Sequence, residues 1–388
     1  MTEVNEYLKE MKEYQQRILE FIDCNVNEIE EKFMNLCDLF KEKKNKDKKQ
    51  YLEMIFNILV SIIDNHFREP MFFDKIKQIL LFFKDSIKKY FDNEMIFEIF
   101  KSNKIILLFL IQQNILIIDQ IVFEKITNGI GILQKYPEYF SPELKKVDFH
   151  YEYQESPEVT DPNFYDKRKS GENDDTICKI IREDSIEELI ISINKGKIKI
   201  NDNIPDSIYE TNLLLLRNEV SLIEYAAFFG STQIFKYLYK NKAICKPSII
   251  QTAIHSNNPE IIDFLQESNI NEKTMEYYFM CFDESIKCHH NQFADYFYSN
   301  YIYDSNQNQN TDVLKEKSFF KSIKYHNFTY IYPEFIDKFH SFCYFCQFNY
   351  HYLVQIFLDT KESLINLKMV YILIIISWNF KLLHIYIF

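Results

Sequence analysis

Cysteine and histidine are the side chains of this sequence whose types and spacing suit metal binding. Cys343 and Cys346 are separated by two residues, and Cys281 and Cys288 lie upstream. Zinc takes four nitrogen or sulfur ligands in a tetrahedron, so two ligand pairs would supply a site. The upstream pair lacks the matching spacing, and residues three apart on a helix simply share one face. The alternative interpretation is that the cysteines are reduced thiols buried in the core. We favour this interpretation over a zinc site, and therefore expect no metal and no other cofactor.

Motifs that indicate catalysis or nucleotide binding are missing from the sequence. Gly129 and Gly131 flank one residue, but no third glycine and no strand pattern accompany them. The phosphate-binding pattern GxxxxGK[ST] does not occur, and neither do GxSxG and HExxH. The nine histidines are dispersed along the chain. We therefore expect no catalytic residues, and a protein that is not an enzyme.

Four residues are candidates for binding a partner: Phe228, Phe229, His255 and Asn257. They lie near the turns of a repeated helical unit, where stacked units would form a concave surface from turns and inner helices. Two interpretations stay open. The side chains are exposed for a protein partner, or they belong to ordinary core and turn structure.

The repeated unit occurs twice between residues 221 and 265. The first copy has Ala226-Ala227, a turn at Gly230, and the apolar pair Ile234 and Leu238. The second has Ala253, a polar turn at 256–258, and the pair Ile261 and Leu265. Small residues allow close helix approach, and a helix–turn–helix unit recurring at about 30 residues is typical of an ankyrin-like solenoid.

Weaker copies extend this predicted ankyrin-like domain over residues 176–360. Residues 176–190 form a first unit with Asp184 at its turn, and 274–297 form a fourth with its turn near His289. Degenerate units are expected at 319–335 and 342–358.

The part of the chain before residue 176 divides by composition. Residues 1–50 are expected to form an amphipathic helical segment with a basic loop, although Gln15 interrupts its apolar seam. Residues 51–150 predict a helical N-terminal domain in which 105–111 form a buried helix, too short to span a membrane. Residues 151–175 carry eight acidic and three basic residues and predict an acidic linker.

Composition favours long helices and a cytoplasmic location. The 388 residues include only 5 glycines and 9 prolines, which leaves few tight turns for sandwiches or barrels. The net charge of −12 and the absence of a basic domain argue against nucleic-acid binding. No apolar signal segment opens the sequence, and eight cysteines without a framework spacing indicate reduced thiols.

The runs SLIEYAAFFGSTQIFKYL, NPEIIDFL and TMEYYFMCF resemble an ankyrin-related domain of unknown function. That domain is found upstream of ankyrin repeats in large protein families of parasitic protists. Earlier runs such as KSNKIILLFLI and YFSPELK resemble the helical region that precedes it, so the resemblance covers roughly residues 51–358. It implies protein–protein interaction through an unidentified partner and brings no catalytic residues. No unit here carries the Thr-Pro-Leu-His turn of regular ankyrin repeats.

Residues 361–388 form an apolar tail with two interpretations. In the first interpretation, residues 369–388 are the membrane anchor of a tail-anchored, membrane-associated adaptor. Against this, Asn379, Lys381 and His384 interrupt the apolar run. We favour the other interpretation, that the reading frame has shifted or entered an intron after Thr360. The overall expectation is an all-α scaffold, a helical N-terminal domain followed by an ankyrin-like helical-repeat solenoid, with its oligomeric state open.

Overall fold

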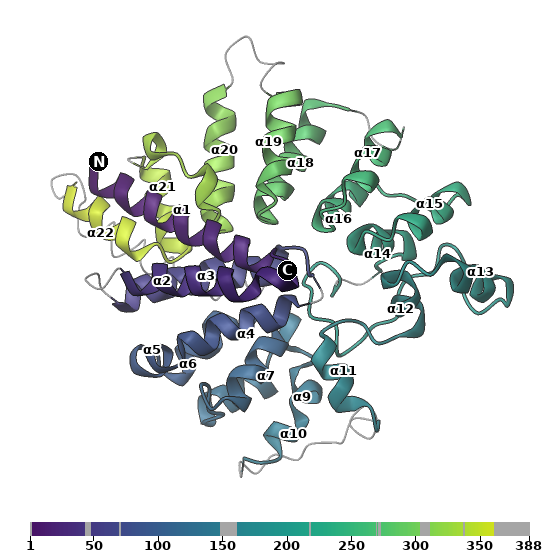
Figure 1. Cartoon of the computed structure of the whole chain (residues 1–388), viewed down its shortest axis with the longest axis horizontal. Helices are drawn as coiled ribbons and strands as arrows, with labels where there is room; N and C mark the ends of the chain where they lie inside the picture. Colours follow the sequence, from purple (N-terminus) through teal and green to yellow (C-terminus); the bar gives the residue numbers. More distant parts are fainter. Residues whose placement is uncertain are drawn as a thin grey trace. The chain divides into compact units, whose positions relative to one another are not determined.

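The computed structural model describes residues 2–42, 48–69, 71–147, 161–216, 219–268, 270, 273–302, 311–336 and 338–360. Within these residues the chain is all-α, as expected, with helices α1 to α22 and no β-strand (Figure 1). An isolated antiparallel bridge between Asn203 and Ser221 is the single β-type pairing found there. Asparagine, aspartate, serine or threonine side chains cap the N-termini of several of these helices.

The chain forms two compact units that do not follow chain order. The first contains Met1–Ile63, Arg68–Asp92 and Ser305–Phe388, and the second contains Asp64–Phe67 and Asn93–Asp304. The expected acidic linker, 151–175, therefore falls within the range of the second unit. The expected repeat range, 176–360, is shared between both units.

The first unit is organised around α1 (Thr2–Ile22), which packs against α2 (Ile29–Glu42) and α4 (Phe72–Phe82). Its remaining helices are α3 (Lys48–Asn65, whose last two residues belong to the second unit), α5 (Lys84–Tyr90), α20 (Thr311–Lys324), α21 (Phe339–Gln347) and α22 (His351–Thr360). The amphipathic pattern predicted for α1 is confirmed, because Leu8, Met11 and Ile18 are buried. Short 3-10 segments lie at Val26–Glu28 (η1), Phe328–Tyr330 (η6) and Pro333–Phe335 (η7).

Gln15 is the polar residue that interrupts the apolar seam of α1, and tertiary contacts explain its presence. The side chain is 1% exposed, and its amide nitrogen donates to Oδ1 of Asn327 at 2.9 Å. Its Oε1 accepts the backbone N–H of Phe328 at 2.5 Å. Gln15 thus pairs with the polar groups of the turn that follows α20, so the helix face stays buried.

The second unit opens with short helices around the buried helix α7 (Lys104–Gln112). These are α6 (Asn93–Phe100), α8 (Gln120–Thr127), α9 (Tyr136–Tyr139), α10 (Ser141–Leu144) and α11 (Phe164–Ser170), with a 3-10 segment at Gly131–Leu133 (η2). Residues 105–110 are all buried, which confirms the predicted buried helix. Asn103 caps α7 by accepting from the backbone N–H of Ile106.

Four helical hairpins follow one another in the second unit (Figure 1). They are α12 (Thr176–Arg182) with α13 (Ile186–Asn194), α14 (Leu222–Phe229) with α15 (Thr232–Lys240), α16 (Ile249–His255) with α17 (Pro259–Glu267), and α18 (Met275–Lys287) with α19 (Asn291–Phe297). A π-helical turn, η4 (Tyr298–Ile302), follows α19. The first helices of successive hairpins pack on one another, as do α13 on α15 and α15 on α17. The four units predicted between 176 and 297 are therefore helix pairs.

Each of these hairpins turns at one residue with a positive φ angle: Asp184, Gly230, Asn257 and His289. In the first hairpin the N–H of Asp184 donates to the carbonyl of Ile181, and the next N–H, of Ser185, donates to that of Ile180. In the second hairpin, the N–H groups of Gly230 and Ser231 donate in the same way to the carbonyls of Ala227 and Ala226. This is the left-handed helix stop favoured by glycine, asparagine and aspartate, so local side-chain chemistry specifies the turn.

Side chains at these turns also join neighbouring hairpins. The Asp184 carboxylate accepts the backbone N–H groups of Gln233 and Ile234 at 3.0 and 2.9 Å, which caps α15 from the preceding hairpin. The Asn258 amide donates to the carbonyl of Gly230 at 3.0 Å. Because these bonds cross hairpins, they fix the register of stacking as well as the individual turns.

The first unit repeats the same turn after α20 and α21. His326 and Asn349 have positive φ angles there. The N–H groups one residue later, of Asn327 and Tyr350, donate to the carbonyls of Ser322 and Phe345. The degenerate unit expected at 342–358 is a helix pair, whereas the unit expected at 319–335 is α20 followed by 3-10 segments only.

Some sequence expectations concern residues outside the described ranges. These are residues 43–47 of the basic loop, residues 148–160 at the start of the expected linker, and the apolar tail, 361–388. Among the helices that are described, none combines the length and apolarity that a membrane crossing requires.

Candidate functional site

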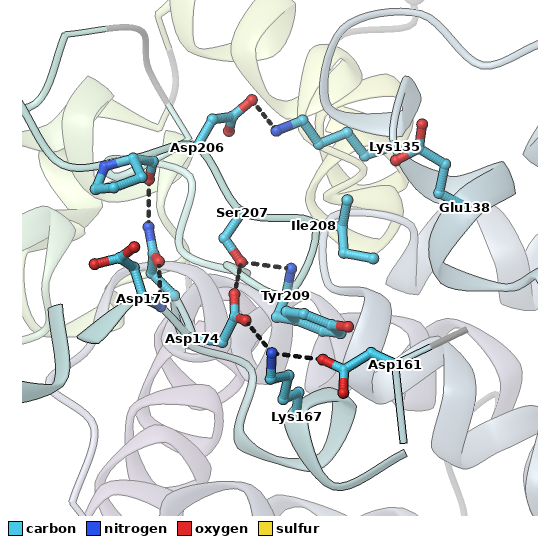
Figure 2. Close-up of a pocket in the computed structure, with 12 residues that line it drawn as sticks. Lys135, Glu138, Asp161, Lys167, Asp174, Asp175, Asp206, Ser207, Ile208 and Tyr209 are labelled. Atoms are coloured by element: carbon cyan, nitrogen blue, oxygen red, sulfur yellow. Dashed lines mark hydrogen bonds and ion pairs between the residues drawn. The ribbon is translucent and has the colours of Figure 1, made fainter. Parts of the chain in front are cut away.

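The second unit contains a polar pocket of about 510 Å³ beside the first hairpin (Figure 2). Its walls come from α9, from α11 and its flanking residues, and from the loop after α13. The lining residues are Lys135, Glu138, Asp161, Lys167, Asn173, Asp174, Asp175, Pro205, Asp206, Ser207, Ile208 and Tyr209. Five carboxylates and two ammonium groups give this lining an excess of negative charge.

Ion pairs hold the pocket's charged groups in place. Lys167 lies 2.7 Å from one carboxylate oxygen of Asp161 and 2.7 Å from one of Asp174 (Figure 2). The hydrogen bond from Lys167 lowers the pKa of Asp161, so this carboxyl group is ionised at neutral pH. Lys135 pairs with Asp206, whose side chain is 76% exposed at the rim. These ion pairs connect both lysines of the lining to three of its five carboxylates.

Hydrogen bonds connect the loop after α13 to Asn173 and Asp174 on the other side of the pocket lining. Asn173 is 1% exposed, and its amide donates to the carbonyl of Pro205 at 2.5 Å. The Ser207 hydroxyl donates to Asp174 at 2.9 Å and accepts the backbone N–H of Tyr209 at 3.1 Å. These bonds give residues 205–209 a defined path although the segment is not helical.

A buried lysine supports the same loop from beneath. Lys104 is 2% exposed and donates its ammonium group to the carbonyl of Ile208. Burial lowers the pKa of Lys104 to about 7, with Glu210 acting in the opposite direction. The ammonium also lies 5.3 Å from the ring centroid of Tyr139. Lys104 stabilises the wall of the pocket without lining it.

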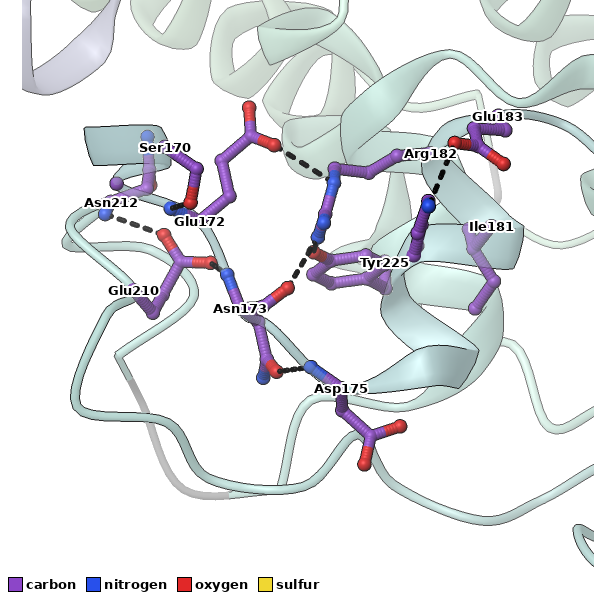
Figure 3. Close-up of polar contacts among 12 residues, drawn as sticks. Ser170, Glu172, Asn173, Asp175, Ile181, Arg182, Glu183, Glu210, Asn212 and Tyr225 are labelled. Carbon is purple, nitrogen blue, oxygen red and sulfur yellow. Dashed lines mark hydrogen bonds and ion pairs between the residues drawn. The ribbon is translucent and has the colours of Figure 1, made fainter. Parts of the chain in front are cut away.

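A second polar network connects the pocket to the hairpin array (Figure 3). Arg182, the last residue of α12, pairs with Glu172 at 2.8 Å and donates to the carbonyl of Asn173 at 2.7 Å. The same guanidinium donates to the hydroxyl of Tyr225 on α14 at 2.7 Å. The buried Glu210 accepts the backbone N–H of Asn173 at 3.2 Å. One arginine thus joins the pocket wall to the first two hairpins.

Arg182 belongs to a series of equivalent positions in the array. Arg182, Phe228, His255 and Lys287 each lie two residues before the left-handed residue of their hairpin. Arg182 bonds to Tyr225, and His255 bonds to Glu284 at 2.9 Å. Tyr225 and Glu284 are themselves equivalent, each five residues before its left-handed residue. Polar pairs between the first helices of successive hairpins therefore recur at the same position relative to the turn.

The structure brings together three of the four predicted binding residues, but it buries two of them. The Phe228 ring stacks on His255 with centroids 5.5 Å apart, and Phe229 contacts Phe228 edge-on at 5.1 Å. Phe228 and His255 are 7% and 2% exposed, and Phe229 is half-buried. Asn257 is exposed at its turn. The exposure considered for Phe228 and His255 is therefore wrong, because neighbouring inner helices cover them.

The four candidate metal-binding cysteines divide between the two units. Cys281 and Cys288 are buried in the second unit, and Cys343 and Cys346 are half-buried in the first. Burial raises the pKa of Cys281 to about 12 and that of Cys346 to about 11, which keeps both thiols protonated. All eight cysteines are free thiols in the structure.

The residues of the pocket were not found from the sequence. Five of its lining residues lie in the expected acidic linker, a segment expected to connect domains rather than to form a site. The signal that was present is the pairing of acids with lysine, between Asp161, Lys167 and Asp174. Chemically, the excess of carboxylates over ammonium groups in the lining suits binding of a cationic group.

Comparison with known proteins identifies no relative: no protein-family model, curated protein or solved structure matches this chain. The resemblance to an ankyrin-related domain therefore stays a prediction from the sequence.

Proposed function

We propose that this chain is a protein-interaction scaffold that binds its partner along an ankyrin-like solenoid formed by α12–α19. The observation that supports the proposal is the recurrence of one turn in four consecutive hairpins whose inner helices stack. Repeats of this kind use their extended surface for recognition rather than for chemistry. The partner is a protein, and the polar pocket beside the first hairpin belongs to the same surface.

The loops between hairpins supply contacts that a partner can reach. Ile244, after α15, is 66% exposed, although its backbone N–H is held by the side chain of Asn201 at 2.9 Å. Asn201 follows the first hairpin, so this bond joins two successive inter-hairpin loops. An apolar side chain on a fixed backbone loses little entropy on binding, which favours Ile244 as a contact.

The charge of the pocket defines the side chains that the partner would present. Carboxylates outnumber ammonium groups in the lining by five to two, and the whole chain has a net charge of −12. A partner segment with lysine or arginine side chains complements both features. Complementary surface charge acts mainly on the association rate and is screened by salt.

Site-specific crosslinking tests the proposal. A photoreactive phenylalanine analogue placed at Ile244 of the full chain is irradiated in native lysate of the source organism, and the same analogue at Met34 serves as control. Met34 is 60% exposed and lies in the first unit. We expect a discrete adduct from position 244 that excess unlabelled chain competes away and that raised salt weakens. Equal labelling from both positions, or none from position 244, contradicts a partner surface on the array.

A further inference from the structure

A buried group of metal-ligating side chains lies between the third and fourth hairpins. His255 is the last residue of α16, and Glu284 and Cys288 lie at the end of α18 and directly after it. The two helices pack on one another. One ligand atom from each of the three side chains lies within 4.8 Å of the other two, and all three residues are buried.

We propose that His255, Glu284 and Cys288 bind one transition-metal ion, with Zn²⁺ the best fit to their chemistry. Imidazole nitrogen, carboxylate oxygen and thiolate sulfur are the three ligand types that zinc takes in proteins. Metal–ligand bonds of about 2.0–2.3 Å place neighbouring ligand atoms roughly 3.5 Å apart in a tetrahedron. The present separations are at most 4.8 Å, so metal binding requires the ligand atoms to move together by up to roughly 1.3 Å. With three protein ligands, the fourth position of the tetrahedron would be taken by water.

Neighbouring residues hold two of the three ligands in orientation. The Phe228 ring stacks on the His255 imidazole with an interplanar angle of 27°. Nδ1 of His66 lies 2.7 Å from the carbonyl oxygen of Cys288, which fixes the backbone that carries the thiol. Outer partners of this kind are what metal sites use to pre-orient their ligands. His66 and Phe228 are thus positioning residues of the proposed site.

The same residues also contact one another in the absence of a metal. Without metal, Glu284 Oε1 lies 2.9 Å from His255 Nε2 and 2.7 Å from the Lys287 ammonium. Metal binding replaces the His255–Glu284 hydrogen bond with two bonds to the ion. The Cys288 thiol releases its proton to solvent, and the Lys287 ammonium, at the helix surface, turns toward water.

Metal analysis and cobalt spectroscopy of the full chain test the site. After dialysis, purified protein is expected to retain stoichiometric zinc by mass spectrometry. Replacement with Co²⁺ is expected to give visible d–d bands and a thiolate-to-cobalt charge-transfer band. Cys288→Ser removes the charge-transfer band, and Glu284→Gln weakens retention. Cys281→Ser is the matched control, because Cys281 lies on α18, is as deeply buried as Cys288 and is outside the group.

X-ray absorption spectroscopy of the wild-type protein with zinc identifies the atoms bound to the metal. This measurement tests the site even if a variant fails to fold. The spectrum is expected to show one sulfur atom bound to zinc, with nitrogen or oxygen as the other ligand atoms and an imidazole among them. Zinc below stoichiometry with no cobalt charge-transfer band in the wild-type protein overturns the site. Zinc bound by several sulfur atoms, or by none, would also overturn the site. The same holds for a cobalt charge-transfer band that is lost in Cys281→Ser and retained in Cys288→Ser.

Discussion

The carboxylate of Asp184 accepts the backbone N–H of Ile234 at 2.9 Å, fifty residues further along the chain. Asp184 is the left-handed residue of the first hairpin, and Ile234 lies in the first turn of the second helix of the next one. One residue therefore reverses its own hairpin and caps its neighbour. Cooperation between hairpins depends on such contacts, because each hairpin alone leaves an apolar face uncovered.

Removing the Asp184 side chain is expected to destabilise the array. Asp184→Gly keeps the positive φ angle but leaves two backbone N–H groups of α15 without their acceptor. Loss of a helix cap costs about 0.5–2 kcal/mol. Asp184→Asn retains an acceptor oxygen and serves as control, with most of the stability kept. Urea unfolding followed by circular dichroism measures both, and equal losses in the two variants would show that the cap contributes nothing.

Alanine is expected to be tolerated less at Gly230 than at Gly196. Both glycines follow a helix with positive φ, so alanine adds backbone strain of roughly 1–2 kcal/mol at each. A Cβ at Gly230 would also lie 3.2 Å from the Asn258 amide nitrogen, whereas nothing lies within 4 Å at Gly196. The expected difference in unfolding free energy is about 1 kcal/mol. Equal values would mean that Asn258 moves aside freely.

Replacing Gln15 with leucine is expected to destabilise the first unit. The substitution keeps side-chain volume but removes the acceptor of the Phe328 N–H and the Gln15 donor to Asn327 Oδ1, which still accepts the backbone N–H of Thr329. A buried polar group that loses its hydrogen bond costs about 1–3 kcal/mol. The control is Gln16→Leu at the adjacent exposed position, which is expected to change stability by less than about 0.5 kcal/mol. Similar unfolding midpoints for both variants would contradict the role assigned to Gln15.

The stability of the first unit is expected to fall on acidification through the titration of His326. Burial lowers the pKa of His326 to about 4 from the ordinary value of 6.5. Between these values the unfolded chain binds the proton and the folded chain does not, so protonation favours unfolding. Stability is full above pH 6.5 and decreases toward pH 4, by roughly 3 kcal/mol in all.

His326→Asn removes this contribution while keeping a residue that tolerates positive φ. Urea unfolding at a series of pH values is expected to show a flatter profile for this variant than for the wild-type chain. The exposed residue His351 provides the control substitution, His351→Asn, which is expected to retain the wild-type slope. Parallel profiles for His326→Asn and the wild type would exclude His326 as the group responsible.

The sequence by itself determined the features of this protein that are encoded locally. Gly230, the polar run at 256–258 and the apolar pair Ile234 and Leu238 specified two hairpins correctly, because a turn depends on the φ preference of a few adjacent residues. The buried helix at 105–110 followed from its apolar run in the same way. Glycine scarcity similarly anticipated an all-α chain.

Only the tertiary structure decided which side chains are covered and which meet. In the sequence, Gln15 only interrupts an apolar seam. The structure shows that it is hydrogen-bonded to Asn327, 312 residues further along the chain. In the sequence, His255 is a candidate for an exposed residue near a turn. In the structure it stacks on Phe228 and is hydrogen-bonded to Glu284. The polar pocket likewise joins α9 to a loop some seventy residues later. Such pairings depend on how helices stack, and stacking is set by the packing of whole faces rather than by any short pattern.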